Sequence, residues 1–213
     1  MTSLKKVAIF ASSFTAFIST SGDELDFGSL ERIEANGSSI GGSSLPSLVR
    51  SSTLKVLITN LKTFGQGGWA ATNGYTFFCT SPLLERLVLG KLQSVPTQMF
   101  YYDQTHTFAN LIDLEIGLGT AVNLNFSDWN PTNVLADATK TATFLQNFRE
   151  HIALRLAQQP ADNPNHLTLT LSQAVFDTIW NADGTPKSTD PDSVIYQINK
   201  IIKTDKHWSV NRA

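Results

Sequence analysis

The sequence predicts an α+β fold in which a mainly antiparallel sheet carries helices on one face. Strand-type segments rich in β-branched and aromatic residues fill the first half of the chain, and the strongest helical periodicity follows residue 130. Strands and helices do not alternate in the sustained way that indicates a parallel α/β sheet. The pair Asn73-Gly74, flanked by apolar and aromatic residues, is typical of a tight hairpin turn.

The expected strands are recognised by alternating apolar and polar residues. Leu54, Val56 and Ile58 alternate through one segment, and apolar residues alternate with Asp113 and Glu115 in another. The expected strands cover residues 5–18, 30–35, 53–61, 98–103 and 108–118. The second of these is short and charged, so we expect it at a sheet edge or in an exposed turn.

Four helices are expected, mainly in the second half of the chain. The longest has apolar residues at three- and four-residue spacing from Val134 to Leu156. Ser81 is a suitable N-cap for an earlier helix with Pro82 in its first turn, and Ser172 is a suitable N-cap for a later one. The expected helices cover residues 82–92, 132–158, 173–180 and 191–204.

A length of 213 residues suits one domain with its own core, so we expect residues 1–213 to form a single α+β domain. We find no internal repeat in the pattern. Glycine and serine dominate residues 36–52, which we expect to form a flexible loop or arm. Residues 1–21 have the layout of a signal peptide, but serine and threonine interrupt their apolar stretch, so a strand is favoured over export.

The run Gly-Ser-Ser-Ile-Gly at 37–41 matches the Gly-x-Ser-x-Gly turn that holds the nucleophile of α/β-hydrolases. That turn needs a buried strand before Ser39 and a helix directly after it. Charged residues precede Ser39, and glycine, serine and Pro46 follow it. The context favours a flexible loop over a nucleophile.

Two pairs of polar residues are candidates for acid–base chemistry. Asp103 and His106 lie within an aromatic stretch, where a carboxylate could orient a histidine as a general base. Three residues apart on a strand they would point to opposite faces, so a hairpin tip is the favoured interpretation. Asp113 and Glu115 share one strand face, and we interpret them as the solvated side of that strand.

Composition argues against several classes of function. The net charge is −2 and only 16% of residues are charged, which disfavours binding to nucleic acid. The single cysteine, Cys79, excludes an internal disulfide and a multi-cysteine metal site. The four histidines lack metal-ligand spacing and no phosphate-loop pattern is present, so no cofactor is expected.

These observations favour a non-enzymatic structural or assembly subunit, most specifically a virion component such as a capsid, neck or tail protein. Its partners would be other protein subunits in a homo-oligomer or a larger assembly, within a virion or the cytoplasm. Two alternatives stay open: a secreted or surface binding module that uses Trp69 and the aromatic residues of 99–108, or a hydrolase that uses Ser39, Asp103 and His106. The expected interface residues are Ser39, Ile40, Leu45, Trp69, Tyr101 and Tyr102.

Overall fold

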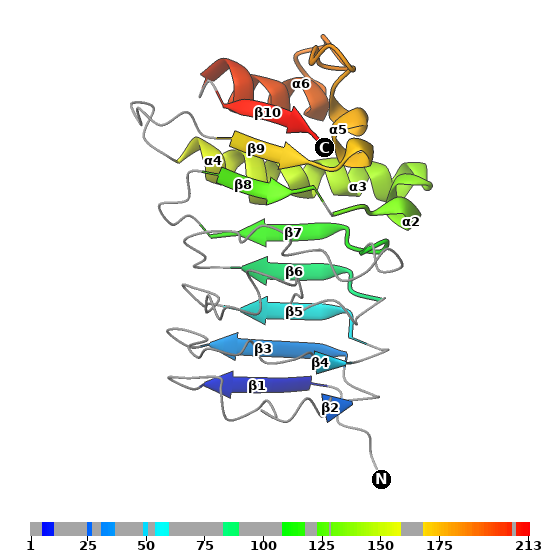
Figure 1. Cartoon of the computed structure of the whole chain (residues 1–213), viewed down its shortest axis with the longest axis vertical. Helices are drawn as coiled ribbons and strands as arrows, with labels where there is room; N and C mark the ends of the chain where they lie inside the picture. The colour runs from blue at the N-terminus through cyan, green and yellow to red at the C-terminus, as the bar shows by residue number, and fades with distance from the viewer. Residues whose placement is uncertain are drawn as a thin grey trace.

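The computed structural model is a ladder of parallel strands with helices gathered at one end (Figure 1). It describes residues 6–10, 25–26, 31–36, 49–50, 54–59, 83–89, 108–117, 123–127, 129–158, 168–205 and 208–213. Within these residues every pairing between named strands is parallel.

The first half of the chain contributes a five-stranded sheet whose strands are neighbours in chain order. The strands are β1 (Lys6–Phe10), β3 (Arg32–Asn36), β5 (Val56–Thr59), β6 (Arg86–Leu89) and β7 (Asp113–Ile116). Successive register partners lie between 24 and 30 residues apart along the chain, in the row Lys6, Arg32, Val56, Arg86 and Asp113. A separate parallel pair, β2 (Leu25–Asp26) and β4 (Val49–Arg50), places part of the predicted 36–52 loop in a strand.

One bonding pattern recurs where consecutive strands begin. The carbonyl oxygens of Glu31, Lys55 and Glu85 each accept two backbone N–H groups from the start of the next strand, at 2.8 to 3.1 Å. Buried leucines stand at matching places in three consecutive segments, as Leu54 and Leu57, Leu84 and Leu87, and Leu111 and Leu114. The chain therefore contains an internal repeat built on Leu-x-x-Leu, contrary to the expectation from sequence.

The predicted mainly antiparallel sheet is wrong, because the strands of both larger sheets are parallel. A two-residue hairpin can only join antiparallel neighbours, whereas parallel neighbours need a crossover of about a dozen residues or more. The spacing of 24 to 30 residues between register partners leaves room for such a crossover. The Asn73-Gly74 turn and the strand predicted at 98–103 lie outside the described residues.

Two elements were misassigned because their patterns are ambiguous. The predicted helix at 82–92 is strand β6. Its buried Leu84 and Leu87 are three residues apart, which suits a helix face but also suits a corner followed by a strand. The segment predicted as an edge strand or exposed turn is β3, which lies between β1 and β5.

A second sheet of three parallel strands follows, in the order β10-β9-β8. Its strands are β8 (Asn123–Phe126), β9 (Thr168–Leu171) and β10 (Ser209–Arg212). Between β8 and β9 the chain forms α2 (Thr132–Leu135), α3 (Ala138–Phe148), the π-helical segment η2 (Arg149–Ala153) and α4 (Leu154–Ala157). Between β9 and β10 it forms α5 (Gln173–Ile179), α6 (Val194–Asn199) and the π-helical segment η3 (Lys200–Asp205). The described helices therefore surround this second sheet, at one end of the ladder, instead of covering one face of the first (Figure 1).

The helix predictions in this half are largely confirmed. The expected helix at 132–158 is present, but it is interrupted at Asp137, whose side chain accepts the N–H groups of Thr139 and Lys140 as the N-cap of α3. Ser172 is the N-cap of α5, as predicted. The last helix begins later than residue 191, because Ser193 is its N-cap.

One hydrophobic core runs through the described residues from Leu54 to Trp208. Its densest part is aromatic, where Trp129 lies 5.4 Å from Phe144 and 6.5 Å from Phe148 between ring centroids. Buried Ser172 donates a hydrogen bond to the carbonyl of Trp129, so the polar atoms at the entry to α5 are paired.

Phe148→Ala is expected to lower the free energy of unfolding by about 3 to 5 kcal/mol, because it removes a buried aromatic ring and leaves a cavity. Chemical denaturation followed by circular dichroism measures this change. The matched control is Gln146→Ala on the exposed side of the same helix, expected to change stability by less than about 0.5 kcal/mol. Equal effects of the two substitutions would contradict the packing described here.

The pKa of Asp177 is lowered from the ordinary value of 3.8, chiefly because Arg212 of β10 donates hydrogen bonds to both of its oxygens. Because its pKa is lowered in the fold, ionised Asp177 stabilises the folded state at pH values above 3.8. This stabilisation is lost as the pH falls through the lowered pKa. We expect an NMR titration to place the Asp177 pKa below 3.8, and Arg212→Gln to move it back towards 3.8. An unchanged pKa in the variant would show that the pair does not form.

Candidate functional site

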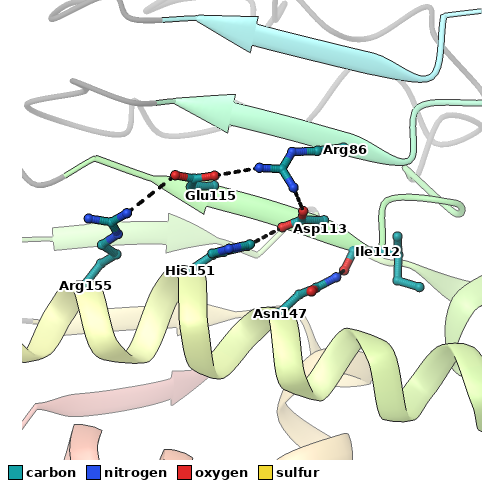
Figure 2. Close-up of polar contacts among 7 residues, drawn as sticks. All are labelled: Arg86, Ile112, Asp113, Glu115, Asn147, His151 and Arg155. Atoms are coloured by element: carbon teal, nitrogen blue, oxygen red, sulfur yellow. Dashed lines mark hydrogen bonds and ion pairs between the residues drawn. The ribbon is translucent and has the colours of Figure 1, made fainter.

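The main polar cluster of the described residues lies where the five-stranded sheet meets the helix formed by α3, η2 and α4. Figure 2 shows Arg86 on β6, Asp113 and Glu115 on β7, and His151 and Arg155 on the helix, drawn together by ion pairs. The cluster is built from residues up to 69 positions apart in the chain, so only the fold brings it together.

The cluster belongs to the side of the sheet opposite the buried leucines. Side chains alternate along a strand, so residues on either side of Leu57, Leu87 and Leu114 point away from the core. We call this side the polar face and define it by Arg32, Val56, Ile58, Arg86, Val88, Asp113 and Glu115. Register aligns these residues in rows across neighbouring strands.

Asp113 is the centre of the cluster. Its side chain is only 8% exposed, and each oxygen has a partner: Arg86 Nη1 at 2.5 Å from Oδ2, and His151 Nδ1 at 2.7 Å from Oδ1. An ionised carboxylate can only accept, so His151 Nδ1 carries the hydrogen and donates it. Burial of this carboxylate is tolerated because a cation and an N–H group replace its hydration.

Glu115, two residues further along β7, is held by two arginine side chains. Arg86 Nη2 lies 2.8 Å from Glu115 Oε2, and Arg155 Nη2 lies 3.6 Å from Glu115 Oε1. One guanidinium therefore bridges two carboxylates of the neighbouring strand. This bridge holds β6 and β7 in register on the polar face.

The helix covers the outer edge of β7 with a polar stripe. Asn147, His151 and Arg155 are spaced four residues apart, and they contact the Ile112 carbonyl, Asp113 and Glu115 in that order. Eight helical residues rise about 12 Å and three strand residues about 10 Å, so the two elements run side by side in step. Figure 2 shows the helix lying alongside β7, with His151 and Arg155 reaching the side chains of Asp113 and Glu115.

The π-helical segment η2 explains why a four-residue spacing stays in line. An α-helix has 3.6 residues per turn, so side chains four apart drift around the axis by about 40° at each step. A π-helical turn is wider, because its hydrogen bonds span five residues, and it offsets this drift. His151 lies in η2, so the stripe keeps facing the straight edge of β7.

The geometry of Asp113 and His151 also resembles a general base oriented by a carboxylate. Such a base needs a nucleophile or a substrate within hydrogen-bond reach, and among the described residues no serine, threonine or cysteine side chain bonds to His151. The contacts of the cluster join β6 to β7 through Arg86, and β7 to the helix through His151 and Arg155.

Metal-ligand clusters and membrane-spanning helices are both absent from the part of the chain that the structure describes. There, no group of three or more His, Cys, Asp or Glu side chains could hold a metal ion. No helix in these residues is long and apolar enough to cross a membrane.

Of the candidate residues singled out from sequence, only Asp113 and Glu115 lie within the described residues. The interpretation of Asp113 and Glu115 as a solvated strand face is wrong, because both carboxylates are paired and Asp113 is buried. The remaining candidates lie outside the described residues, namely Ser39, Ile40, Leu45, Trp69, Cys79, Tyr101, Tyr102, Asp103 and His106. Sequence reasoning did not single out Arg86, His151 or Arg155 as site residues. The polar spacing Asn147, His151, Arg155 beside an apolar stripe could have indicated the two helical residues, but nothing in it points to Arg86.

No protein-family model matches the chain, and no curated protein or solved structure is significantly similar to it. Its function is therefore argued from its own residues.

Asp113→Ala is expected to lower the free energy of unfolding by about 1 to 3 kcal/mol, because it removes hydrogen bonds to a charged group and leaves Arg86 and His151 without their shared acceptor. Thermal and chemical unfolding measure the loss. The control is Glu85→Ala, whose exposed ion pair with Lys55 at 3.6 Å is expected to contribute at most about 1 kcal/mol. If Asp113→Ala leaves the free energy of unfolding unchanged, the cluster does not attach the helix.

Proposed function

We propose that this chain is a protein-binding scaffold, in which the polar face of a short parallel repeat array is the binding surface. In Leu84–Leu89 and Leu111–Ile116, the Leu-x-x-Leu pattern is followed two residues later by a further apolar residue. This pattern resembles the strand signature of leucine-rich repeats. The recurrence of 24 to 30 residues agrees with that kind of repeat. Stacked repeats of this type present extended surfaces to their partners.

The observation that carries the proposal is the position of Val56 and Ile58. Both are only partly buried: Val56 lies in register between Arg32 on β3 and Arg86 on β6, and Ile58 lies in register beside Val88 of β6. Apolar side chains within a charged surround are typical of the centre and rim of a protein interface. The helix packs beside β7, and Val56 and Ile58 keep intermediate exposure, whereas Val88 beside them is buried.

Charge supports a protein partner over a nucleic acid. On the polar face Arg86 binds two carboxylates, those of Asp113 and Glu115. A surface that binds phosphate backbones needs an excess of lysine and arginine, and the whole chain has a net charge of −2.

The proposed scaffold is compatible with the two non-enzymatic classes expected from sequence. An assembly subunit and a surface binding module would both use a protein-binding face. The virion assignment, export and the hydrolase alternative with Ser39, Asp103 and His106 stay predictions.

Selection of a phage-displayed library of random peptides on the immobilised chain tests the proposal. We expect enriched peptides whose binding is weakened at least about tenfold by Ile58→Glu, because the substitution places a charge at the centre of the interface. Val56→Thr, which is nearly isosteric, should weaken binding less and keep the fold.

Ala142→Glu serves as the control, since it adds the same charge on the exposed surface of α3. Circular dichroism checks that each variant is folded. If Ile58→Glu and Ala142→Glu retain equal affinity for the enriched peptides, the polar face is not the binding surface.

A further inference from the structure

We infer that the partner of the polar face is a protein segment that pairs an acidic side chain with an apolar one, the acid binding Arg155 and Arg86 and the apolar side chain packing on Ile58. This inference rests on the proposed function and specifies the chemistry of its partner.

Two rows of side chains lead from the apolar middle of the polar face to the helix. One row contains Val56, Arg86 and Asp113 and ends at His151. The other contains Ile58, Val88 and Glu115 and ends at Arg155. Neighbouring strands are about 4.8 Å apart, so Ile58 and Glu115 are separated by about 10 Å. One short peptide segment can therefore reach both the apolar centre and the arginines.

The charges of this region are unequally exposed. The side chains of Arg86 and Arg155 are 39% and 42% exposed, whereas those of Asp113 and Glu115 are 8% and 21% exposed. The carboxylates are thus covered by the groups that bind them, and the outermost charged atoms are guanidinium nitrogens. An approaching partner meets positive charge first, which favours an acidic group and disfavours a basic one.

The arginines also retain hydrogen-bond donors. A guanidinium has five N–H groups, and Arg86 uses its two terminal nitrogens for one carboxylate oxygen each. Among the described residues Arg155 contacts only Glu115, at 3.6 Å, which is longer than a hydrogen bond. Arg155 can therefore turn towards a second carboxylate with little loss, because so long and exposed an ion pair contributes little to stability.

The test uses the full chain and the same phage-displayed random peptides. We expect the enriched peptides to carry aspartate or glutamate close to an aliphatic or aromatic residue. For one synthetic enriched peptide, Arg155→Gln should weaken binding about five- to tenfold and reduce its sensitivity to salt. Arg155→Lys should keep part of the affinity, because the charge remains.

Two controls make the result specific. Lys140→Gln removes a positive charge from the exposed surface of α3 and should leave binding unchanged. Replacing the acidic residue of the peptide by its amide should weaken binding to the wild-type chain, but add little once Arg155 is glutamine, since the two changes remove the same contact.

The outcomes separate this inference from the proposed function. If Ile58→Glu abolishes binding while Arg155→Gln does not affect it, the polar face binds protein but the acidic partner is wrong. Enriched peptides without acidic residues overturn the inference in the same way. If neither substitution affects binding, or if no peptide is enriched, both proposals fail.

Discussion

The open edge of β7 is the constraint on which the rest of the structure depends. The last strand of a parallel ladder has N–H and C=O groups without a neighbouring strand, and the core beside it has no further repeat to pack against. Both must be covered. The helix of α3, η2 and α4 meets both needs: Phe144, Phe148 and Ile152 enter the core, and Asn147, His151 and Arg155 bind the strand. Polar contacts therefore attach the helix to β7 on the side facing Asp113 and Glu115.

The polar cluster joins three elements of the fold through charged side chains. Asp113 is buried, so it requires both Arg86 and His151 as partners, and these contacts fix β6, β7 and the helix relative to one another. The same contacts determine which atoms are outermost on the polar face. The interior of the cluster holds the carboxylates, and the guanidinium groups of Arg86 and Arg155 are more exposed than the carboxylates they contact.

Local signals predicted local structure well. The periodicity of 132–158 and the capping residue Ser172 correctly indicated helices, because capping and the burial of one helix face involve residues close in the chain. The segment at 53–61 was correctly assigned as a strand for the same reason. The predictions failed where one spacing fits two structures, as at Leu84 and Leu87, and where charged residues at 30–35 were taken to exclude an inner strand.

The sequence by itself determined the helical second half, the cap of α5, the apolar residues of the core and the low charge that disfavours nucleic acid. Only the tertiary structure decided the parallel direction of the strands, the inner place of β3 and the site formed by Arg86, Asp113, Glu115, His151 and Arg155. The physical reason is distance along the chain. Alternation tells which residues face the core, but strand direction and pairing depend on where the chain returns 24 to 30 residues later.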